Sequence, residues 1–406
     1  MEYNIHTLSN GLRVLHIPAK IPVSYVGVVL DVGTRDESID ESGMAHFIEH
    51  MLFKGTEKRK STQVISCLEN VGGQIDAYTT KEETYIYSVV PQKYTLKAVN
   101  LLSDVVMNSV FPEKELQKER VVVIDEIQSY NDSPSELIYD DFEEMLFPND
   151  AIGRNILGNE ASLATFDSAK LKAFTRRCYT AGRMLVFSLG NIKFDRFVKC
   201  VENSFTLPFS DARACRCAPS AYTPSRKVVN KDTYQAHCII GNRCGSINSE
   251  DRYALALLNN ILGGPNMSSL LNMAVRERNG LCYTIESGVT NYVDTGVWSI
   301  YFGCDEKNLN RTQQICFKQL EKLASAPISN SRLATAKRQF IGQMQIANQN
   351  LENVVLNISK LVLHNIPLLE NKLVIDRINR ISADELLSLA SQLFDRDKLS
   401  VLTYVE

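Results

Sequence analysis

The strongest constraint on the fold is that the chain repeats one pattern, on either side of a stretch without periodicity. In each half a strand and a turn precede an apolar helix that ends near glycine, at GMAHFIEHMLFKG and again at DRYALALLNNILGG. Laying Leu52–Gly55 on Ile261–Gly264 gives an offset of 209 residues. A long-period repeat with two copies indicates a duplication. The sequence therefore predicts two homologous half-domains, 1–208 and 225–406, joined by a linker at 209–224.

Both halves mix long helices with short strands. Alternating runs on either side of Asn10-Gly11 predict a β-hairpin, and Gln74 to Pro91 alternates over two further strands. Glu113 to Tyr130, which starts just after a proline, has the pattern of a helix. Long helices beside antiparallel strands indicate the α+β class, with helices packed on a mixed or antiparallel sheet in each half.

The sharpest chemical feature is His46-Phe-Ile-Glu49-His50 in the first copy of the repeated helix. Helical residues four apart lie on one side of the helix, about one turn apart, so both imidazoles can bind one metal ion. Zinc accepts neutral imidazole, and a carboxylate such as Glu49 can take a proton from the water that zinc activates. The alternative is a pair of surface histidines, which fits poorly because the helix is otherwise apolar. In the second copy the corresponding residues are Leu255, Leu258 and Asn259.

A catalytic zinc site usually has three protein ligands and an open position, so a third ligand must come from elsewhere. Glu126 is the best candidate, because it lies among apolar residues in VVVIDEIQ and an acid in such a segment needs a partner. Glu119 lies seven residues earlier, on nearly the same helical face, where it can orient a ligand or form a surface salt bridge. The residues themselves do not decide between Glu119, Asp125 and Glu126.

Composition excludes several other classes of protein. The net charge of −3 does not favour nucleic acid or an anionic membrane as a partner, and no apolar run is long enough to span a bilayer. The N-terminus lacks the layout of a signal peptide, so a cytoplasmic location is expected. The ten cysteines have no framework spacing and are expected to be reduced thiols. The close pair Cys215 and Cys217 has no second pair at zinc-finger spacing.

The segment GMAHFIEHMLFKGT resembles the signature of the pitrilysin-type (M16) zinc metallopeptidases, and LSNGLRV, GGQIDAYT and the C-terminal half match that family in order. The resemblance covers the whole chain and is to the short bacterial and mitochondrial-processing-peptidase-like members. It implies a clamshell arrangement of a zinc-binding first half and a metal-free second half. It also implies one Zn²⁺ per chain held by His46, His50 and Glu126, with Glu49 as general base and Glu119 as a second acid at the site.

The resemblance also implies residues that contact the substrate. In RERNGLCY, Arg276 and Tyr283 match a pair that closes over the substrate from the metal-free half, where a guanidinium and a phenol can donate to a carbonyl oxygen. The alternative for this pair is a helix end at Gly280 followed by a strand. An edge strand that pairs with an extended substrate corresponds to Gly73, Gln74, Ile75, Asp76 and Ala77.

Two positions depart from the family pattern. Asp76 replaces the usual asparagine, and an ionised acid accepts hydrogen bonds but does not donate them. Leu270 stands where many members have arginine. Both departures put details of substrate recognition in doubt and leave hydrolysis untouched.

The sequence therefore predicts a zinc metalloendopeptidase that cleaves peptides or unfolded polypeptide segments, with a homodimer expected and a heterodimer possible. One alternative is a non-catalytic scaffold or partner subunit, a kind of member that typically loses part of the zinc motif. Another is a processing peptidase that is active only with a different partner chain.

Overall fold

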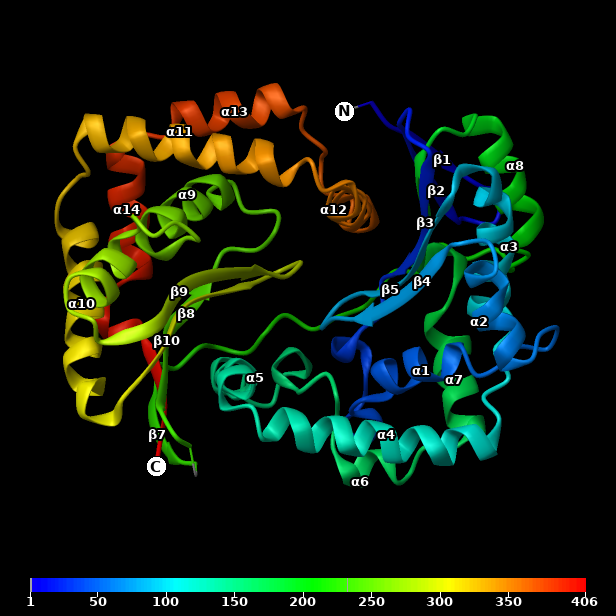
Figure 1. Ribbon diagram of the computed structural model, residues 1–406, viewed down its shortest axis with the longest axis horizontal. Coiled ribbons are helices and arrows are strands. Elements are labelled where there is room, and N and C mark those ends of the chain that lie inside the picture. The colour runs from blue at the N-terminus through cyan, green and yellow to red at the C-terminus, as the bar shows by residue number, and fades with distance from the viewer. Residues whose placement is uncertain (1, 232) are drawn as a thin grey trace. The chain divides into compact units, whose positions relative to one another are not determined.

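The computed structural model describes residues 2–231 and 233–406, which form two compact units with one β-sheet each. Unit 1 comprises Met1–Gln128, Arg154–Cys217 and Asn348–Leu368. Unit 2 comprises Ser129–Gly153, Ala218–Ala347 and Leu369–Glu406. The α+β class predicted from the sequence is confirmed, since helices pack on a sheet in each unit (Figure 1).

Unit 1 contains a six-stranded mixed sheet in the order β1-β2-β6-β3-β5-β4. Its strands are β1 (Asn4–Thr7), β2 (Arg13–Pro18), β3 (Val23–Leu30), β4 (Gln74–Thr79), β5 (Thr84–Pro91) and β6 (Met184–Gly190). Its helices are α1 (Met44–Leu52), α2 (Ser61–Glu69), α3 (Thr95–Asn108), α4 (Glu113–Asn131), α6 (Glu160–Leu163), α7 (Ser168–Cys178), α8 (Phe194–Ser204) and α12 (Leu351–Leu363), the last turn of α4 passing into unit 2. The hairpin predicted at Asn10-Gly11 joins β1 to β2, and Gly11 has the positive φ of 92° that its turn requires.

Unit 2 contains a five-stranded sheet in the order β7-β11-β8-β10-β9. Its strands are β7 (Arg226–Asn230), β8 (Ala236–Cys244), β9 (Cys282–Asn291), β10 (Gly296–Cys304) and β11 (Ser400–Val405). Its helices are α5 (Pro134–Leu146), α9 (Arg252–Gly263), α10 (Leu309–Ser325), α11 (Asn330–Ala347), α13 (Asn371–Arg380) and α14 (Ala383–Leu393), with a π-helical segment at Asn272–Glu277.

The two sheets have the same topology. The order β7-β11-β8-β10-β9 repeats β2-β6-β3-β5-β4, and in both sheets the first two strands are parallel while the other neighbours are antiparallel. The helix α9 follows β8 as α1 follows β3. This agreement confirms the internal duplication predicted from the sequence.

The units do not coincide with the halves of the sequence, because one helix from each half packs in the other unit. In α12, Val355 and Val362 are buried with Leu185 and Phe187 of the unit 1 sheet, on the face opposite α3 and α8 (Figure 1). Helix α5 packs on β8 and β11 of unit 2 in the same manner. Along β3, Val28 faces the α3 side and Val29 the α12 side, as the two-residue period of a strand requires.

The start of the predicted linker is bound to unit 1. The side chain of Arg216 is 8% exposed, and its guanidinium lies 2.9 Å from Asp31 Oδ1 and 2.7 Å from Asp36 Oδ2. All ten cysteines are free thiols, and Cys215 and Cys217 on either side of Arg216 are exposed. Over residues 2–231 and 233–406, the helices are too short or too polar to cross a bilayer.

A buried ion cluster ties α12 to the turn between β4 and β5. Glu83 is 1% exposed, and its carboxylate lies 2.7 Å from His364 Nε2 and 3.1 Å from Lys360 Nζ. The hydroxyl of Thr80 also donates to it, at 2.7 Å. Burial alone would raise the pKa of Glu83, but the hydrogen bond from His364 and the charge of Lys360 outweigh burial and lower the pKa to about 2.

Replacing Glu83 with glutamine is therefore expected to destabilise the protein by about 3 kcal/mol at pH 7. A carboxyl whose pKa falls from 4.5 to about 2 on folding stabilises the folded state above pH 4.5 and loses this effect as the pH falls to about 2. The difference in denaturant midpoint between wild type and Glu83→Gln should shrink over that range. The control Glu321→Gln removes an ion pair whose carboxylate side chain is 60% exposed, and should change stability by less than about 1 kcal/mol. A Glu83→Gln midpoint equal to wild type at pH 7 would contradict the assignment.

Candidate metal centre

Helix α1 holds His46, Glu49 and His50 on a rigid support. Phe47, Ile48 and Met51 are buried in the core of unit 1, which fixes the rotation of the helix about its axis. The helix begins after Gly43, whose φ of 88° lies in the left-handed region. Glu37 accepts backbone hydrogen bonds from Gly43 at 2.9 Å and from Ala45 at 2.8 Å, which supplies acceptors for the helix start.

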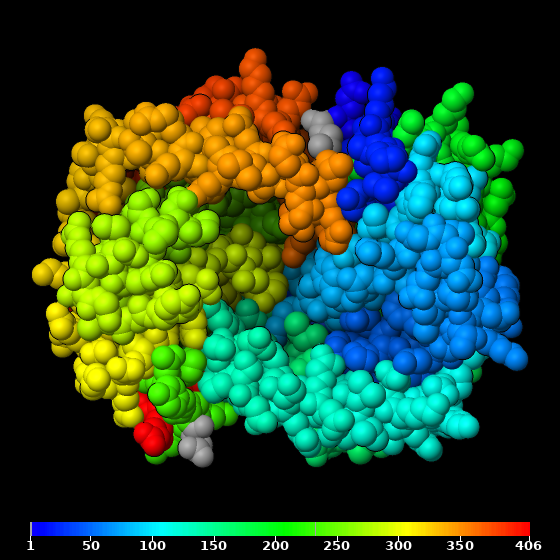
Figure 2. Space-filling model, in the orientation of Figure 1, coloured from blue at the N-terminus to red at the C-terminus, as the bar shows by residue number. Residues whose placement is uncertain are grey.

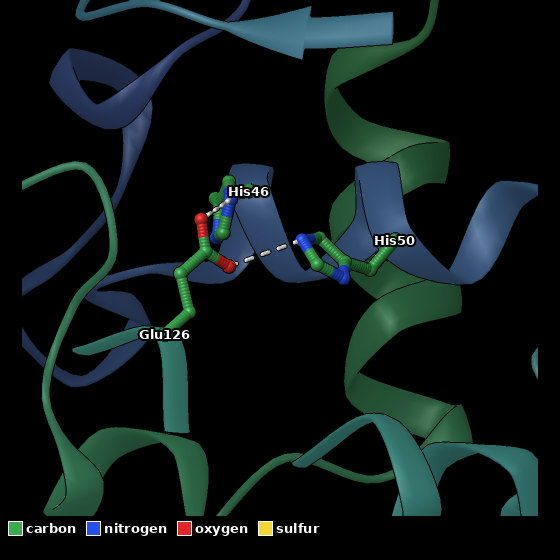
Figure 3. Close-up of side chains that lie close together, drawn as sticks. All are labelled: His46, His50 and Glu126. Atoms are coloured by element: carbon green, nitrogen blue, oxygen red, sulfur yellow. Dashed lines mark ion pairs between the residues drawn. The ribbon is translucent and has the colours of Figure 1, made fainter. Parts of the chain in front are cut away.

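The structure brings His46, His50 and Glu126 together, as the sequence predicted. One ligand atom from each lies within 4.8 Å of the other two. His46 Nε2 is 3.8 Å from Glu126 Oε1, and His50 Nε2 is 3.5 Å from Glu126 Oε2 (Figure 3). Two ligand atoms on a tetrahedral zinc ion lie about 3.3 Å apart, since each is about 2.0–2.1 Å from the metal. The three side chains therefore fit around one such ion with small movements.

The pKa shifts of His46 and Glu126 suit a metal, whereas the carboxylates of Glu126 and Glu119 outweigh burial and raise the pKa of His50, whose proton a metal ion would have to displace. Burial and the charge of His50 lower the pKa of His46 to about 4, so its ring is neutral at pH 7 and has a lone pair to give. Contact with His50 is the main cause that lowers the pKa of Glu126, which keeps that carboxylate ionised. Neutral imidazole and carboxylate are both ordinary zinc donors.

Helix α4 brings one of the three acids that the sequence left open close to the histidines. Glu126 faces the two histidines, whereas its neighbour Asp125 is exposed and outside the cluster. Glu119 lies seven residues before Glu126 and is buried. Its Oε2 lies 3.3 Å from His50 Nδ1 and its Oε1 lies 2.6 Å from Lys54 Nζ. A carboxylate on the far nitrogen of a metal-binding histidine fixes the tautomer and direction of the ring. The outer side of α4 lies on the molecular surface (cyan in Figure 2).

Glu49 lies on the same helix, one residue before His50, and is largely buried. Its Oε2 accepts a hydrogen bond of 2.6 Å from the hydroxyl of Thr79. Burial raises the pKa of Glu49, while the Thr79 hydrogen bond and the charge of His50 oppose that rise. A carboxyl with a raised pKa is suited to exchange a proton near neutral pH.

The strand predicted to bind substrate is the edge strand β4 of the unit 1 sheet. It pairs with β5 on one side and ends the strand order on the other. Asp76 is exposed, with Oδ1 accepting from the backbone N–H of Ala77 at 2.9 Å and Oδ2 lying 3.3 Å from the Tyr87 hydroxyl. Gly73 precedes the strand, and a Cβ there would lie 2.7 Å from a methyl group of Val90. Gln74 is exposed, and Ile75 packs against the core.

Arg276 and Tyr283 form a pair within unit 2. The guanidinium of Arg276 lies 5.1 Å from the centre of the Tyr283 ring, within cation–π range. Tyr283 is 81% exposed at the start of the edge strand β9. Arg276 lies in the π-helical segment, a distortion that often occurs at functional sites. Leu270, the other departure from the family pattern, packs against the unit 2 core.

Sequence reasoning missed Thr79, Lys54 and Glu37. Thr79 is inside the quoted segment GGQIDAYT, but nothing in the spacing shows that its hydroxyl reaches a glutamate 30 residues away. Glu37 precedes α1 by too many residues to be recognised as a cap, because it reaches the helix start across a turn. Lys54 follows α1 directly, and its partner on α4 could be found only from the fold.

Comparison with known proteins places this chain in a family. The family model described as Insulinase (Peptidase family M16) matches residues 13–160, and the model described as Peptidase M16 inactive domain matches residues 165–340. An uncharacterized zinc protease of Bacillus subtilis is 32% identical over 97% of this chain and 96% of its own length. The chain belongs to the M16 peptidase family. An uncharacterized zinc protease of Rickettsia felis is 30% identical over 97% of this chain and 95% of its own length.

Solved structures agree with this M16 fold. A protease from Helicobacter pylori superposes with a TM-score of 0.91 at 21% identity and covers 100% of both chains. A protein from Pseudomonas fluorescens, described as a peptidase M16 inactive domain, superposes with a TM-score of 0.92 at 18% identity, covering 100% of this chain and 98% of its own. These likenesses support the fold.

Proposed function

We propose that this M16 protein is a zinc metalloendopeptidase that hydrolyses peptides or unfolded polypeptide segments. One observation carries the proposal: ligand atoms of His46, His50 and Glu126 lie within 4.8 Å of one another. Glu49 lies on α1, the helix of the two histidines. Zinc held by these three side chains would polarise the scissile carbonyl and activate water. The names of the relatives from Bacillus subtilis and Rickettsia felis support zinc as the metal.

Each residue has a separate task in this proposal. Glu49 accepts the proton of the attacking water and delivers it to the leaving amine. Glu119 holds His50 through Nδ1 and keeps Nε2 directed at the site. The free edge of β4 takes an extended substrate by main-chain hydrogen bonds, which tolerates varied sequence. Arg276 and Tyr283 are assigned to the substrate carbonyl or its oxyanion, to which a guanidinium and a phenol can donate.

The scaffold alternative is disfavoured because this chain retains the whole polar set. A non-catalytic subunit has no need for two histidines and a glutamate around one point, nor for a carboxylate held beside them. Loss of any one of these side chains would leave the others as clustered polar groups without a function. The proposed assembly is a homodimer in the cytoplasm.

Metal removal tests the proposal directly. Treatment with a chelator is expected to reduce cleavage of a fluorescence-quenched peptide to the rate of the buffer control, and stoichiometric zinc is expected to restore it. Metal content measured alongside should fall from one zinc per chain and return to it. A protein that cleaves the peptide equally well with no metal would disprove the proposal. A protein that binds no zinc and cleaves nothing, alone or mixed with other chains, would support the scaffold alternative.

A further inference from the structure

We propose that Thr79 is a positioning residue for the general base: its hydroxyl holds the Glu49 carboxylate in the orientation that accepts the proton from water. This inference rests on the proposed peptidase function and adds a residue to it. The hydroxyl of Thr79 donates to Glu49 Oε2 at 2.6 Å, the short distance expected when an O–H donates to a carboxylate. A hydroxyl has one proton to donate, so this bond uses the donor capacity of Thr79 fully.

The contact constrains a side chain that would otherwise be mobile. Glutamate has three rotatable bonds, and Glu49 is not fully buried, unlike Phe47 and Ile48 of the same helix. With Oε2 held by Thr79, the carboxylate has fewer orientations to adopt, and this bond leaves Oε1 for water. Proton transfer requires a heavy-atom distance of about 2.6–3.2 Å, so a free carboxylate would meet this condition for only part of the time.

Thr79 is itself fixed from two sides. It is the last residue of β4 and lies opposite Thr84 of β5 in the antiparallel pairing. The next residue, Thr80, donates to the buried carboxylate of Glu83 at 2.7 Å, and Glu83 is bound in turn by His364, just after α12, at 2.7 Å. The turn after β4 is therefore anchored in the ion cluster of unit 1, and the Thr79 hydroxyl has little freedom to follow a moving glutamate.

The position of Thr79 also links recognition to chemistry. The strand β4 that presents the edge for an extended substrate carries, at its end, the donor for the base. Ala77 and Thr79 are two residues apart and point to the same face of the sheet, toward α1. A substrate paired with β4 would therefore extend toward the Glu49 carboxylate at the end of that strand.

The test compares two variants at position 79. Thr79→Val keeps the shape and strand propensity but removes the hydroxyl, and kcat is expected to fall roughly 10- to 100-fold with KM changed less than about threefold. Thr79→Ser restores the hydroxyl and should recover kcat to within about threefold of wild type. Zinc content should stay at one per chain in both variants.

A matched control separates positioning from stability. Thr84→Val removes the hydroxyl directly opposite, which donates to the backbone carbonyl of Val32 at 2.8 Å and does not reach Glu49. This variant should lower thermal stability while leaving kcat unchanged. If Thr79→Val and Thr84→Val lower kcat alike, or if Thr79→Val loses zinc, the positioning role is wrong.

A crystal structure of Thr79→Val gives a readout that does not depend on activity. The Glu49 carboxylate is expected to leave its wild-type orientation or to occupy two orientations. An unchanged, single Glu49 conformer would overturn the inference even if wild type proved to be no peptidase. Failure of the peptidase proposal itself would appear differently, as wild-type protein that does not cleave or as activity that survives Glu49→Gln.

Discussion

Replacing Glu49 with glutamine is expected to abolish peptide cleavage and to leave the zinc content unchanged. The amide has nearly the same size, and its oxygen can still accept the hydrogen bond that Thr79 donates to Oε2. It cannot take a proton from water near neutral pH, so the loss should reach the roughly 100- to 10,000-fold that general acid–base catalysis contributes. The measurements are kcat on a quenched peptide and metal content by elemental analysis on the same preparation.

A glutamate on the surface of the neighbouring helix provides the control. Glu69 at the end of α2 is exposed, and Glu69→Gln makes the same chemical change away from the site. It should retain wild-type kcat and stability. Cleavage by Glu49→Gln at more than about a tenth of the wild-type rate would show that another group serves as the base.

His46, Glu49 and His50 were predictable as one group because their arrangement depends on the local geometry of a single helix. An i, i+4 spacing on a helix fixes two side chains on one face whatever the rest of the chain does, so His46 and His50 follow from the sequence. The helix containing Glu119 and Glu126 was equally clear, and the structure extends it from Glu113 to Asn131. Which of its acids faces the histidines depends on how α4 packs against α1, and a helical pattern does not contain this information.

The partners of these residues could not be found in the same way. The hydrogen bond from Thr79 to Glu49 joins a strand end to a helix, and the ion pair of Lys54 with Glu119 joins two helices. Such contacts arise from tertiary packing rather than from spacing along the chain. The same limit applies to α5 and α12. Their amphipathic patterns predict a buried face, but not that each packs in the unit formed mainly by the other half.

Loss of a metal ligand should have the largest effect of any single change, and α4 offers a matched pair of variants for it. Glu126→Gln removes the charged oxygen donor that lies 3.5 Å from His50 Nε2, whereas Asp125→Asn neutralises the exposed acid beside it. Only Glu126→Gln should lose zinc on dialysis, with affinity lowered by more than the roughly 10- to 100-fold cost of losing an outer partner.

The same reasoning applies to His50→Ala, which removes one ring of the pair and the contact with Glu119 at once. Its zinc content and its cleavage should both fall to background. The outcome differs from that of Glu49→Gln, which keeps the zinc and loses only peptide cleavage.

If zinc stays bound in Glu126→Gln but is lost in Asp125→Asn, the third ligand has been misassigned and α4 presents a different face to α1. If neither variant loses zinc, two histidines hold the ion with a donor from outside α4, and the proton chemistry assigned to Glu49 would need a new geometry.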